Sequence, residues 1–203
     1  MASGVLLTGI VAMLTYQSGL AVSFASGPLM WIVALSPLAF VMAMSFGLNK
    51  MSRGTLQILF WAFATVMGLS LSTIFLRFTG ESIAATFFAT AGAFAGLSLF
   101  GYTTKKDLSG MGTFLVMGVI GLLIAMVINM FLGSSTLGLV ISFLGVLIFA
   151  GLTAYDAQRL KREYEYLRGT EFVGKAVIMG ALSLYLDFIN MFMFLLQFMG
   201  NRE

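Results

Sequence analysis

Residues 108–155 read LSGMGTFLVMGVIGLLIAMVINMFLGSSTLGLVISFLGVLIFAGLTAY and contain no charged side chain. An ionised side chain at the centre of a bilayer costs at least ~2.5–3.5 kcal/mol, so a charge-free run of this length indicates membrane-spanning structure. A helix crosses roughly 30 Å of hydrocarbon with about 20 apolar residues. The run is therefore long enough for two spans, which we divide at Gly133-Ser134-Ser135.

Similar apolar runs occupy most of the remaining chain: 1–49, 54–76, 82–104, and 176–201 with the single interruption Asp187. The first run also holds two spans, divided at Gly27-Pro28, because proline ends a helix or begins the next one. None of the runs alternates apolar and polar residues as the strands of a barrel do. The sequence therefore predicts an all-α integral membrane protein. Residues 1–203 form one domain of seven transmembrane helices, at about 4–25, 28–48, 55–76, 82–102, 111–132, 136–156 and 176–199.

The composition excludes several classes of function. The chain is 60% hydrophobic and only 9% charged, whereas a soluble domain carries roughly a quarter charged residues. It contains no cysteine and no histidine, which excludes disulfides, thiol nucleophiles, Cys/His zinc sites and a Ser-His pair. We expect no cofactor and no nucleic-acid partner, and the lipid bilayer is the first partner.

Lysine and arginine predict the orientation. The loops between spans 2 and 3, 4 and 5, and 6 and 7 lie on one side and hold Lys50, Arg53, Lys105, Lys106, Arg159, Lys161, Arg162, Arg168 and Lys175. The other side holds Arg77 and Arg202. By the positive-inside rule the cation-rich side is cytoplasmic, which predicts an N-terminus inside and a C-terminus outside. The first run lacks the positive region and cleavage site of a secretory signal, so we expect its spans to be retained.

Asp187 is the most informative residue, because it lies near the middle of the last span, roughly 16 Å from either end. Acids inside a membrane are hypotheses for functional sites by default. Ser183, Asp187, Asn190 and Gln197 follow helical spacing and form a polar stripe on an otherwise apolar helix. Such a stripe must face protein or water, which predicts a central last helix. The alternative is a protonated Asp187 that only bonds neighbouring helices together.

Asp156 ends the sixth run. One interpretation is an interfacial acid paired with Arg159, three residues further along the helix. Counting residues places Asp156 at the cytoplasmic end of its span and Asp187 near mid-bilayer, an axial gap of roughly 16 Å.

The remaining charged and small residues favour structural roles. Asp107 is expected to be a solvated loop charge or a helix cap, and 157–175 a solvated cytoplasmic connection. Gly92 and Gly96, four residues apart with alanines around them, predict a face on which a neighbouring helix packs closely.

Three segments resemble one known family. The stretch 154–159, AYDAQR, resembles the acidic end of the sixth helix in the Bax inhibitor-1 family. The stretch 181–190, ALSLYLDFIN, is very similar to the signature of that family's last helix, and 101–108, GYTTKKDL, resembles its bacterial members. The resemblance covers essentially the whole chain.

The resemblance implies a seven-helix fold around the last helix, with Asp156 and Asp187 as a paired-carboxyl site. Bacterial members are regarded as pH-sensitive calcium leak channels of the cytoplasmic membrane. In the family, a basic residue at the end of the second helix latches onto the acid site, and here Lys50 or Arg53 would fill that role.

Two carboxylates in a low dielectric cannot both ionise cheaply, so the pair is expected to share a proton. Calcium takes 6–8 oxygens, to which Ser183 and Asn190 would add theirs, and protons would compete with calcium for the site.

Two other functions match parts of the sequence. An intramembrane aspartyl protease of the presenilin type would use Tyr155-Asp156, but Leu184-Tyr185-Leu186 precedes Asp187 where that class has Gly-x-Gly. The only prolines are Pro28 and Pro37, so its Pro-Ala-Leu element is missing, and we expect no enzyme. The resemblance also leaves open a non-conducting modulator, since some bacterial members associate with a membrane-anchored AAA protease.

Overall fold

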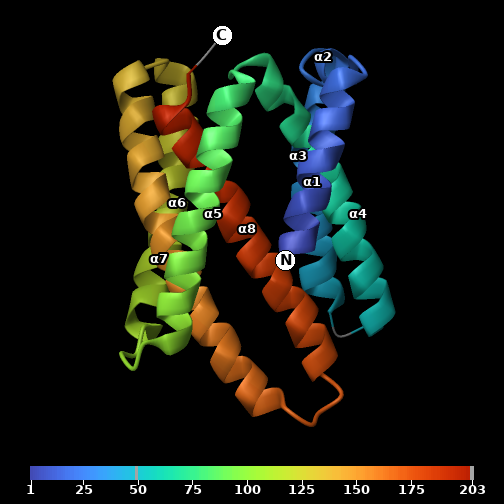
Figure 1. Ribbon diagram of the computed structural model, residues 1–203, viewed down its shortest axis with the longest axis vertical. Coiled ribbons are helices and arrows are strands. Elements are labelled where there is room, and N and C mark those ends of the chain that lie inside the picture. Colours follow the sequence, from blue (N-terminus) through green and yellow to red (C-terminus); the bar gives the residue numbers. More distant parts are fainter. Residues whose placement is uncertain (49, 202–203) are drawn as a thin grey trace. The chain divides into compact units, whose positions relative to one another are not determined.

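A computed structural model describes residues 1–48 and 50–201. In that part of the chain the secondary structure is helical, and the helices are labelled in Figure 1. They are α1 (Ala2–Gln17), α2 (Leu20–Phe24), α3 (Gly27–Gly47), α4 (Arg53–Leu71), the 3-10 helix η1 (Ser72–Leu76), α5 (Gly80–Thr103), α6 (Ser109–Leu132), α7 (Ser135–Leu167) and α8 (Val173–Met199).

The structure confirms an all-helical membrane protein but does not confirm the count of seven spans. Six helices among the described residues are long and apolar enough to cross a bilayer: α3, α4 continued by η1, and α5 to α8. The predicted first span, 4–25, is instead divided into α1 and α2. The division falls at Gly19, whose φ of 78° lies in the left-handed region that glycine adopts without strain. The helix before it is therefore only 16 residues long.

The described chain divides into two compact units. The first comprises Met1–Gly80 and Gly169–Tyr185, and the second comprises Glu81–Arg168 and Leu186–Asn201. Helix α8 contributes its first half to the first unit and its second half to the second unit.

The first unit is held together by close packing of α1 on α4 and by a buried tyrosine of α8. A Cβ atom at Gly68 would lie 2.8 Å from the Thr8 carbonyl oxygen, so only glycine permits this approach. The Thr8 hydroxyl donates to the Ala64 carbonyl oxygen at 2.8 Å and lies 2.6 Å from the hydroxyl of Tyr185. Tyr185 is fully buried, with the ring of Phe63 edge-on against it. These contacts attach the first half of α8 to α1 and α4.

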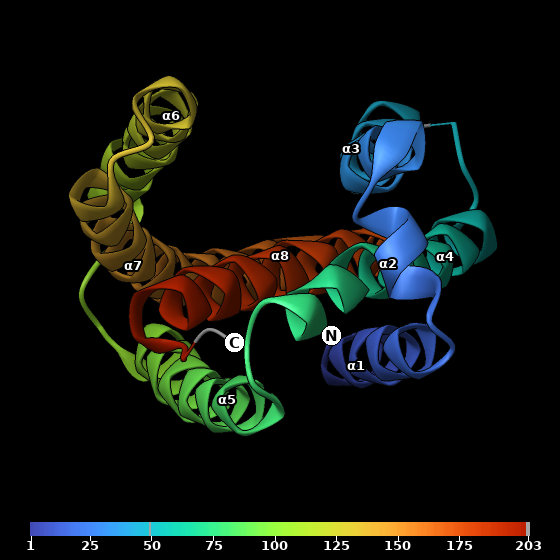
Figure 2. The same ribbon diagram turned by 90° about the horizontal axis from the view of Figure 1, so that it is seen from above.

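In the second unit, α6 and α7 lie side by side in both views (Figures 1 and 2). Helix α8 packs on α5 through Phe188, whose ring centroid lies 5.5 Å from that of Phe94. It packs on α7 where Gly145 leaves room for the ring of Phe194.

The glycines of α5 pack differently from the prediction. Cβ atoms built at Gly92 and Gly96 would meet nothing within 4 Å, so the predicted small-residue face has no neighbouring helix in the described chain. The close approach occurs instead at Gly101, where a Cβ would lie 2.1 Å from the Ala154 carbonyl oxygen of α7. The prediction of close packing at Gly92 and Gly96 is therefore wrong, and the close approach lies five residues beyond Gly96, on another face of α5.

Helix α7 continues well past its predicted end at residue 156. It runs to Leu167, because residues 157–167 are good helix formers without glycine or proline. Gly169, with a φ of 89°, follows the helix end. The first part of the expected loop 157–175 is therefore helical.

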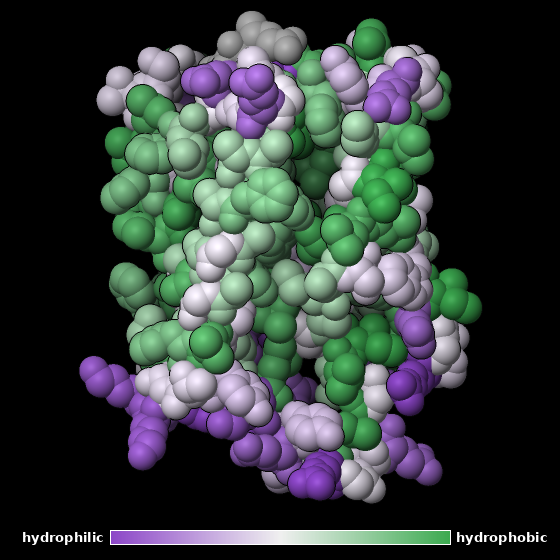
Figure 3. Space-filling model, in the orientation of Figure 1, coloured by the Kyte–Doolittle hydropathy of each residue, from purple (hydrophilic) through white to green (hydrophobic). Residues whose placement is uncertain are grey.

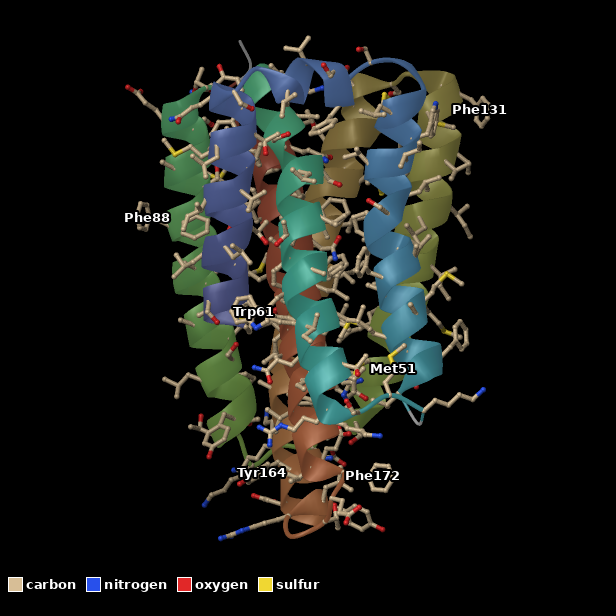
Figure 4. The ribbon with its side chains drawn as sticks, turned by 90° about the vertical axis from the view of Figure 1, so that its right-hand side faces the viewer. Met51, Trp61, Phe88, Phe131, Tyr164 and Phe172 are labelled. Carbon is tan, nitrogen blue, oxygen red and sulfur yellow. The ribbon has the colours of Figure 1, made fainter. Side chains whose placement is uncertain are left out.

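The outward surfaces suit a lipid environment. Figure 3 shows helices with hydrophobic side chains along their middle and hydrophilic ones near their ends. Phe88 and Phe131 point away from the helices in Figure 4 and are 73% and 80% exposed. Exposed aromatic side chains of this kind are stable in contact with lipid, not water.

Candidate functional site

The second unit brings together the two acids that the resemblance paired. Asp156 on α7 and Asp187 on α8 form a side-chain hydrogen bond with each other. They are only 6% and 5% exposed. A hydrogen bond between two carboxyl groups requires a proton on at least one of them.

One oxygen of this pair is left without a hydrogen-bond partner. It is Oδ2 of Asp187, which is buried and lies among described residues that offer it no donor. A buried polar atom without a partner is uncommon in native structures and calls for an explanation such as a bound water or ion. Oδ2 of Asp187 is therefore the atom of the pair that could coordinate a water or an ion.

The extension of α7 explains why the two acids meet although residue counting separates them. Asp156 does not end its helix, which continues for about three turns to Leu167. The preceding Ala154 packs against Gly101 of α5, so this part of α7 lies within the second unit and not at its edge. The assumption that failed was that the first charged residue marks the end of the helix.

Arg159 is the ion-pair partner of Asp156. Its Nη2 lies 3.2 Å from Oδ1 of Asp156, the three-residue spacing that the sequence suggested as one interpretation. The guanidinium also lies over the ring of Tyr155, 5.7 Å from its centroid. The Arg159 side chain is 44% exposed and the Asp156 side chain 9%, so the pair joins a buried acid to a half-exposed cation.

Two residues after Asp156, Gln158 of α7 attaches the loop between α5 and α6 to α7. It is 6% exposed, donates from Nε2 to the Lys106 carbonyl oxygen at 2.8 Å, and accepts from the Leu108 backbone N–H at 2.9 Å. Arg162 donates to the same Oε1 of Gln158. Sequence reasoning missed both residues, although their four-residue spacing on a helix was a usable signal.

Asp107 belongs to the same loop. Its Oδ1 accepts from the Ser109 backbone N–H at 3.0 Å and from Nη2 of Arg162 at 2.7 Å. The Ser109 backbone bond and then the Arg162 bond lower the pKa of Asp107 from 3.8 to about 2. The expected solvated acid is thus exposed but tied to α7.

The predicted supporting residues of α8 differ in their contacts. Asn190 donates from Nδ2 to the Leu186 carbonyl oxygen of its own helix at 2.8 Å, so its amide oxygen stays available. Ser183 lies one turn before Asp187 on α8 and is half-buried. At the end of the stripe, Oε1 of Gln197 lies 3.5 Å from the Ser142 hydroxyl of α7.

The two latch candidates lie in the first unit. Lys50 follows α3 in the turn that leads to α4, and Arg53 is the first residue of α4. The Arg53 side chain lies over Gly174, where a Cβ would be 2.7 Å from its Cδ. Asp156 pairs with Arg159 and Asp107 pairs with Arg162, and neither of these two ion pairs involves Lys50 or Arg53.

The chemistry of the paired acids suits a hard cation that is bound weakly. The described residues form no group of three or more acidic side chains that would hold a metal tightly. Two carboxylates supply up to four oxygens, and calcium takes 6–8 in a flexible geometry, so waters or backbone carbonyls would complete its shell.

Comparison with known proteins identifies similar chains. Residues 1–203 match the model of a family described as inhibitor of apoptosis-promoting Bax1. The inner membrane protein YbhL of Escherichia coli is 43% identical, over 100% of this chain and 88% of its own. An uncharacterized protein of Caulobacter vibrioides is 53% identical, over 87% of this chain and 71% of its own. The uncharacterized protein RP147 of Rickettsia prowazekii is 43% identical, over 100% and 86%.

Proposed function

Because the chain belongs to the Bax inhibitor-1 family, we propose that this multi-pass inner-membrane protein is a pH-sensitive leak channel for calcium. In this proposal Asp156 and Asp187 bind the passing cation, and a proton shared between them opposes its binding. The bacterial cytoplasmic membrane is the site of action, with the N-terminus inside and the C-terminus outside. Calcium is the transported substrate, and the protein is not an enzyme.

The buried carboxyl pair with its unpartnered oxygen is the observation that carries the proposal. Burial of a purely structural acid is costly unless all its polar atoms are paired. Oδ2 of Asp187 has no partner within the described chain, whereas Asp156 is paired with both Asp187 and Arg159. An acid whose only role is to join two helices would have both of its carboxyl oxygens hydrogen-bonded.

The competition between protons and cations follows from charge. With one proton shared, the pair carries a single negative charge, and the Arg159 guanidinium offsets that charge. A divalent cation binds well only when the shared proton leaves and both carboxylates face it. Calcium binding and flux should therefore rise with pH and fall in acid.

The test is calcium flux into liposomes that contain only this protein, measured between about pH 6 and about pH 8. We expect the wild-type flux to increase with pH. Asp187→Asn and Asp156→Asn should each lower the flux at the alkaline end by about tenfold, the effect of losing ~1.4 kcal/mol of coordination, and flatten the pH profile. Asp107→Asn, which removes the remaining aspartate from an exposed loop, is the matched control and should keep the wild-type profile.

The same measurement separates the alternatives. Identical pH profiles in wild type and both pair variants would remove the paired-acid mechanism. An absence of flux at every pH, together with a membrane protease that co-purifies with the chain, would favour a modulator of that partner.

A further inference from the structure

Ser98 of α5 carries a second buried oxygen that has no hydrogen-bond partner. Among the side chains that the structure describes, the buried polar atoms in this condition are Oγ of Ser98 and Oδ2 of Asp187. Both residues belong to the second unit. Since such atoms are uncommon in native structures, two of them in one unit point to a single occupant that would satisfy both.

The Ser98 hydroxyl differs from other hydroxyls of its helix. A serine or threonine within a helix commonly donates to the carbonyl oxygen four residues before it. Thr90 donates in this way to the Thr86 carbonyl oxygen at 2.8 Å, and Thr103 also donates to a carbonyl oxygen of α5. Ser98 makes no such bond, so its hydroxyl is not occupied by the backbone of its own helix.

Ser98 lies on the face of α5 that packs against the two helices of the acid pair. Phe94, Ser98 and Gly101 are separated by four and three residues, so they share one face. The Phe94 ring centroid lies 5.5 Å from that of Phe188 on α8. Gly101 lies against the Ala154 carbonyl oxygen of α7, with no room for a Cβ. Ser98 therefore lies between a contact with α8 and a contact with α7.

The two acids lie next to the same contacts. Asp187 directly precedes Phe188 on α8, and Asp156 follows Ala154 by two residues on α7. Along the axis of α5, Ser98 is within about 6 Å of either contact, since a helix rises about 1.5 Å per residue. The three helices that pack together here therefore carry Asp156, Asp187 and Ser98 at neighbouring levels.

The chemistry of the two unpartnered oxygens suits a hard cation. Oγ of Ser98 and Oδ2 of Asp187 are not hydrogen-bonded to each other, so an occupant between them is needed to satisfy both. Calcium takes 6–8 oxygen ligands, neutral as well as charged. The acid pair supplies up to four of them, so a neutral hydroxyl from a third helix adds a ligand without adding charge.

We propose that Ser98 is a ligand of the calcium ion at the acid pair, and that this ion lies between Oγ of Ser98 and Oδ2 of Asp187. This inference rests on the proposed function. Ser98 coordinates through a lone pair of its hydroxyl oxygen and keeps its proton, so ion binding releases no proton from it. Three helices, α5, α7 and α8, then share one ion.

The experiment is equilibrium dialysis of the purified full-length protein with radioactive calcium at about pH 8, where protons compete least with the ion. Ser98→Ala should weaken calcium affinity by about five- to tenfold, because one coordinating oxygen is lost. Ser98→Thr retains the hydroxyl and should keep the affinity within about twofold of wild type.

Thr90→Val is the matched control. It removes a buried hydroxyl from the same helix, two turns before Ser98, and nearly preserves the shape of the side chain. The Thr90 hydroxyl is bonded to the backbone of its own helix. Thr90→Val should therefore leave calcium affinity unchanged.

A second measurement reports coordination directly. Terbium(III) takes oxygen ligands as calcium does, and its luminescence lifetimes in H₂O and in D₂O give the number of waters bound to the ion. In Ser98→Ala the bound ion should carry about one water more than in wild type, because a water replaces the hydroxyl. Thr90→Val should carry the wild-type number.

Wild-type affinity and a wild-type water number in Ser98→Ala would overturn the proposal, and so would a weaker affinity without an added water. A loss of affinity in Thr90→Val equal to that in Ser98→Ala would overturn it as well, because any buried hydroxyl of α5 would then have the same effect. The proposed function fails separately: no calcium binding by the wild-type protein, or affinity unchanged by Asp187→Asn, would remove the cation site itself.

Discussion

At the scale of single residues, neighbouring side chains on α7 serve different partners. Asp156 bonds to Asp187 on α8, Gln158 holds the backbone of the loop between α5 and α6, and Arg162 reaches Asp107. Successive residues of a helix point about 100° apart, so a short stretch contacts several neighbours at once. Substitutions in this stretch should therefore have separable effects, on the acid pair at Asp156 and on the loop at the other positions.

Asp107 gives a prediction for the pH dependence of stability. Its pKa is about 2 in the folded protein against an ordinary value of 3.8, so the charged form is favoured by folding. The contribution is fully present above the ordinary pKa and is lost as the pH falls through the folded one. Asp107→Asn should lower the thermal unfolding temperature in detergent at neutral pH, and the difference from wild type should shrink between about pH 4 and about pH 2.

Glu165→Gln is the control for this measurement, because it removes an exposed acid of α7. It should show no comparable change across the same pH range. A deficit of Asp107→Asn that stays constant down to about pH 2.5 would show that the charge of Asp107 contributes nothing. At that pH the carboxyl group is already largely protonated in the unfolded chain, so a contribution from the charge would have begun to fall.

The sequence predicted some of these residue contacts and not others. The ion pair of Asp156 with Arg159 followed from helical spacing and is present at 3.2 Å. The proximity of Asp156 to Asp187 came only from the family resemblance, because it depends on where α7 lies against α8. The bonds of Gln158 to backbone groups around residue 107 join positions far apart in sequence, and a single sequence carries no signal for such pairs.

At the scale of elements, the apolar runs predicted where the helices lie. Some predicted helix ends were wrong, because charged residues and glycines were given the wrong weight as signals of a helix end. Charge does not stop a helix, so α7 continues through Arg159 and Arg162 to Leu167. Glycine in a left-handed conformation does stop one, so α1 ends before Gly19 although the sequence there carries no charge. Hydropathy indicates which segments of the chain can contact lipid, whereas backbone geometry determines where a helix ends.

Two glycines of α5 give a matched test of helix packing. Gly101→Ala would place a Cβ 2.1 Å from the Ala154 carbonyl oxygen, a backbone atom that cannot turn aside. We expect a loss of stability of about 1–3 kcal/mol, the usual cost of overpacking, or more if α5 and α7 separate. Gly96→Ala would meet nothing within 4 Å, and it should be neutral or stabilising by up to ~1 kcal/mol through helix propensity.

Thermal unfolding of both variants in the same detergent measures the difference. A Gly101→Ala protein as stable as wild type would mean that α5 does not lie this close to α7. A marked loss of stability in Gly96→Ala would mean that its open face is covered, as the small-residue spacing first suggested.

At the scale of the whole molecule, the number of membrane crossings depends on α1. Its 16 residues extend about 24 Å, less than the roughly 30 Å of a hydrocarbon core. Helices α3 to α8 meet the length requirement by themselves. The loops rich in lysine and arginine lie on one side in either case, so the C-terminus is expected outside. Only the side of the N-terminus changes, inside for seven crossings and outside for six.

Cysteine labelling decides this question directly, because the chain contains no cysteine and each introduced thiol reports alone. In intact cells, a membrane-impermeant maleimide should label Asn201→Cys and should label Lys106→Cys only after permeabilisation, as the positive-inside rule requires. Ala2→Cys should behave like Lys106→Cys, because we predict seven crossings. Labelling of Ala2→Cys in intact cells would reduce the count to six. Exchange of the Asn201→Cys and Lys106→Cys results would reverse the orientation and place Lys106, with the loop between α5 and α6, outside the cell.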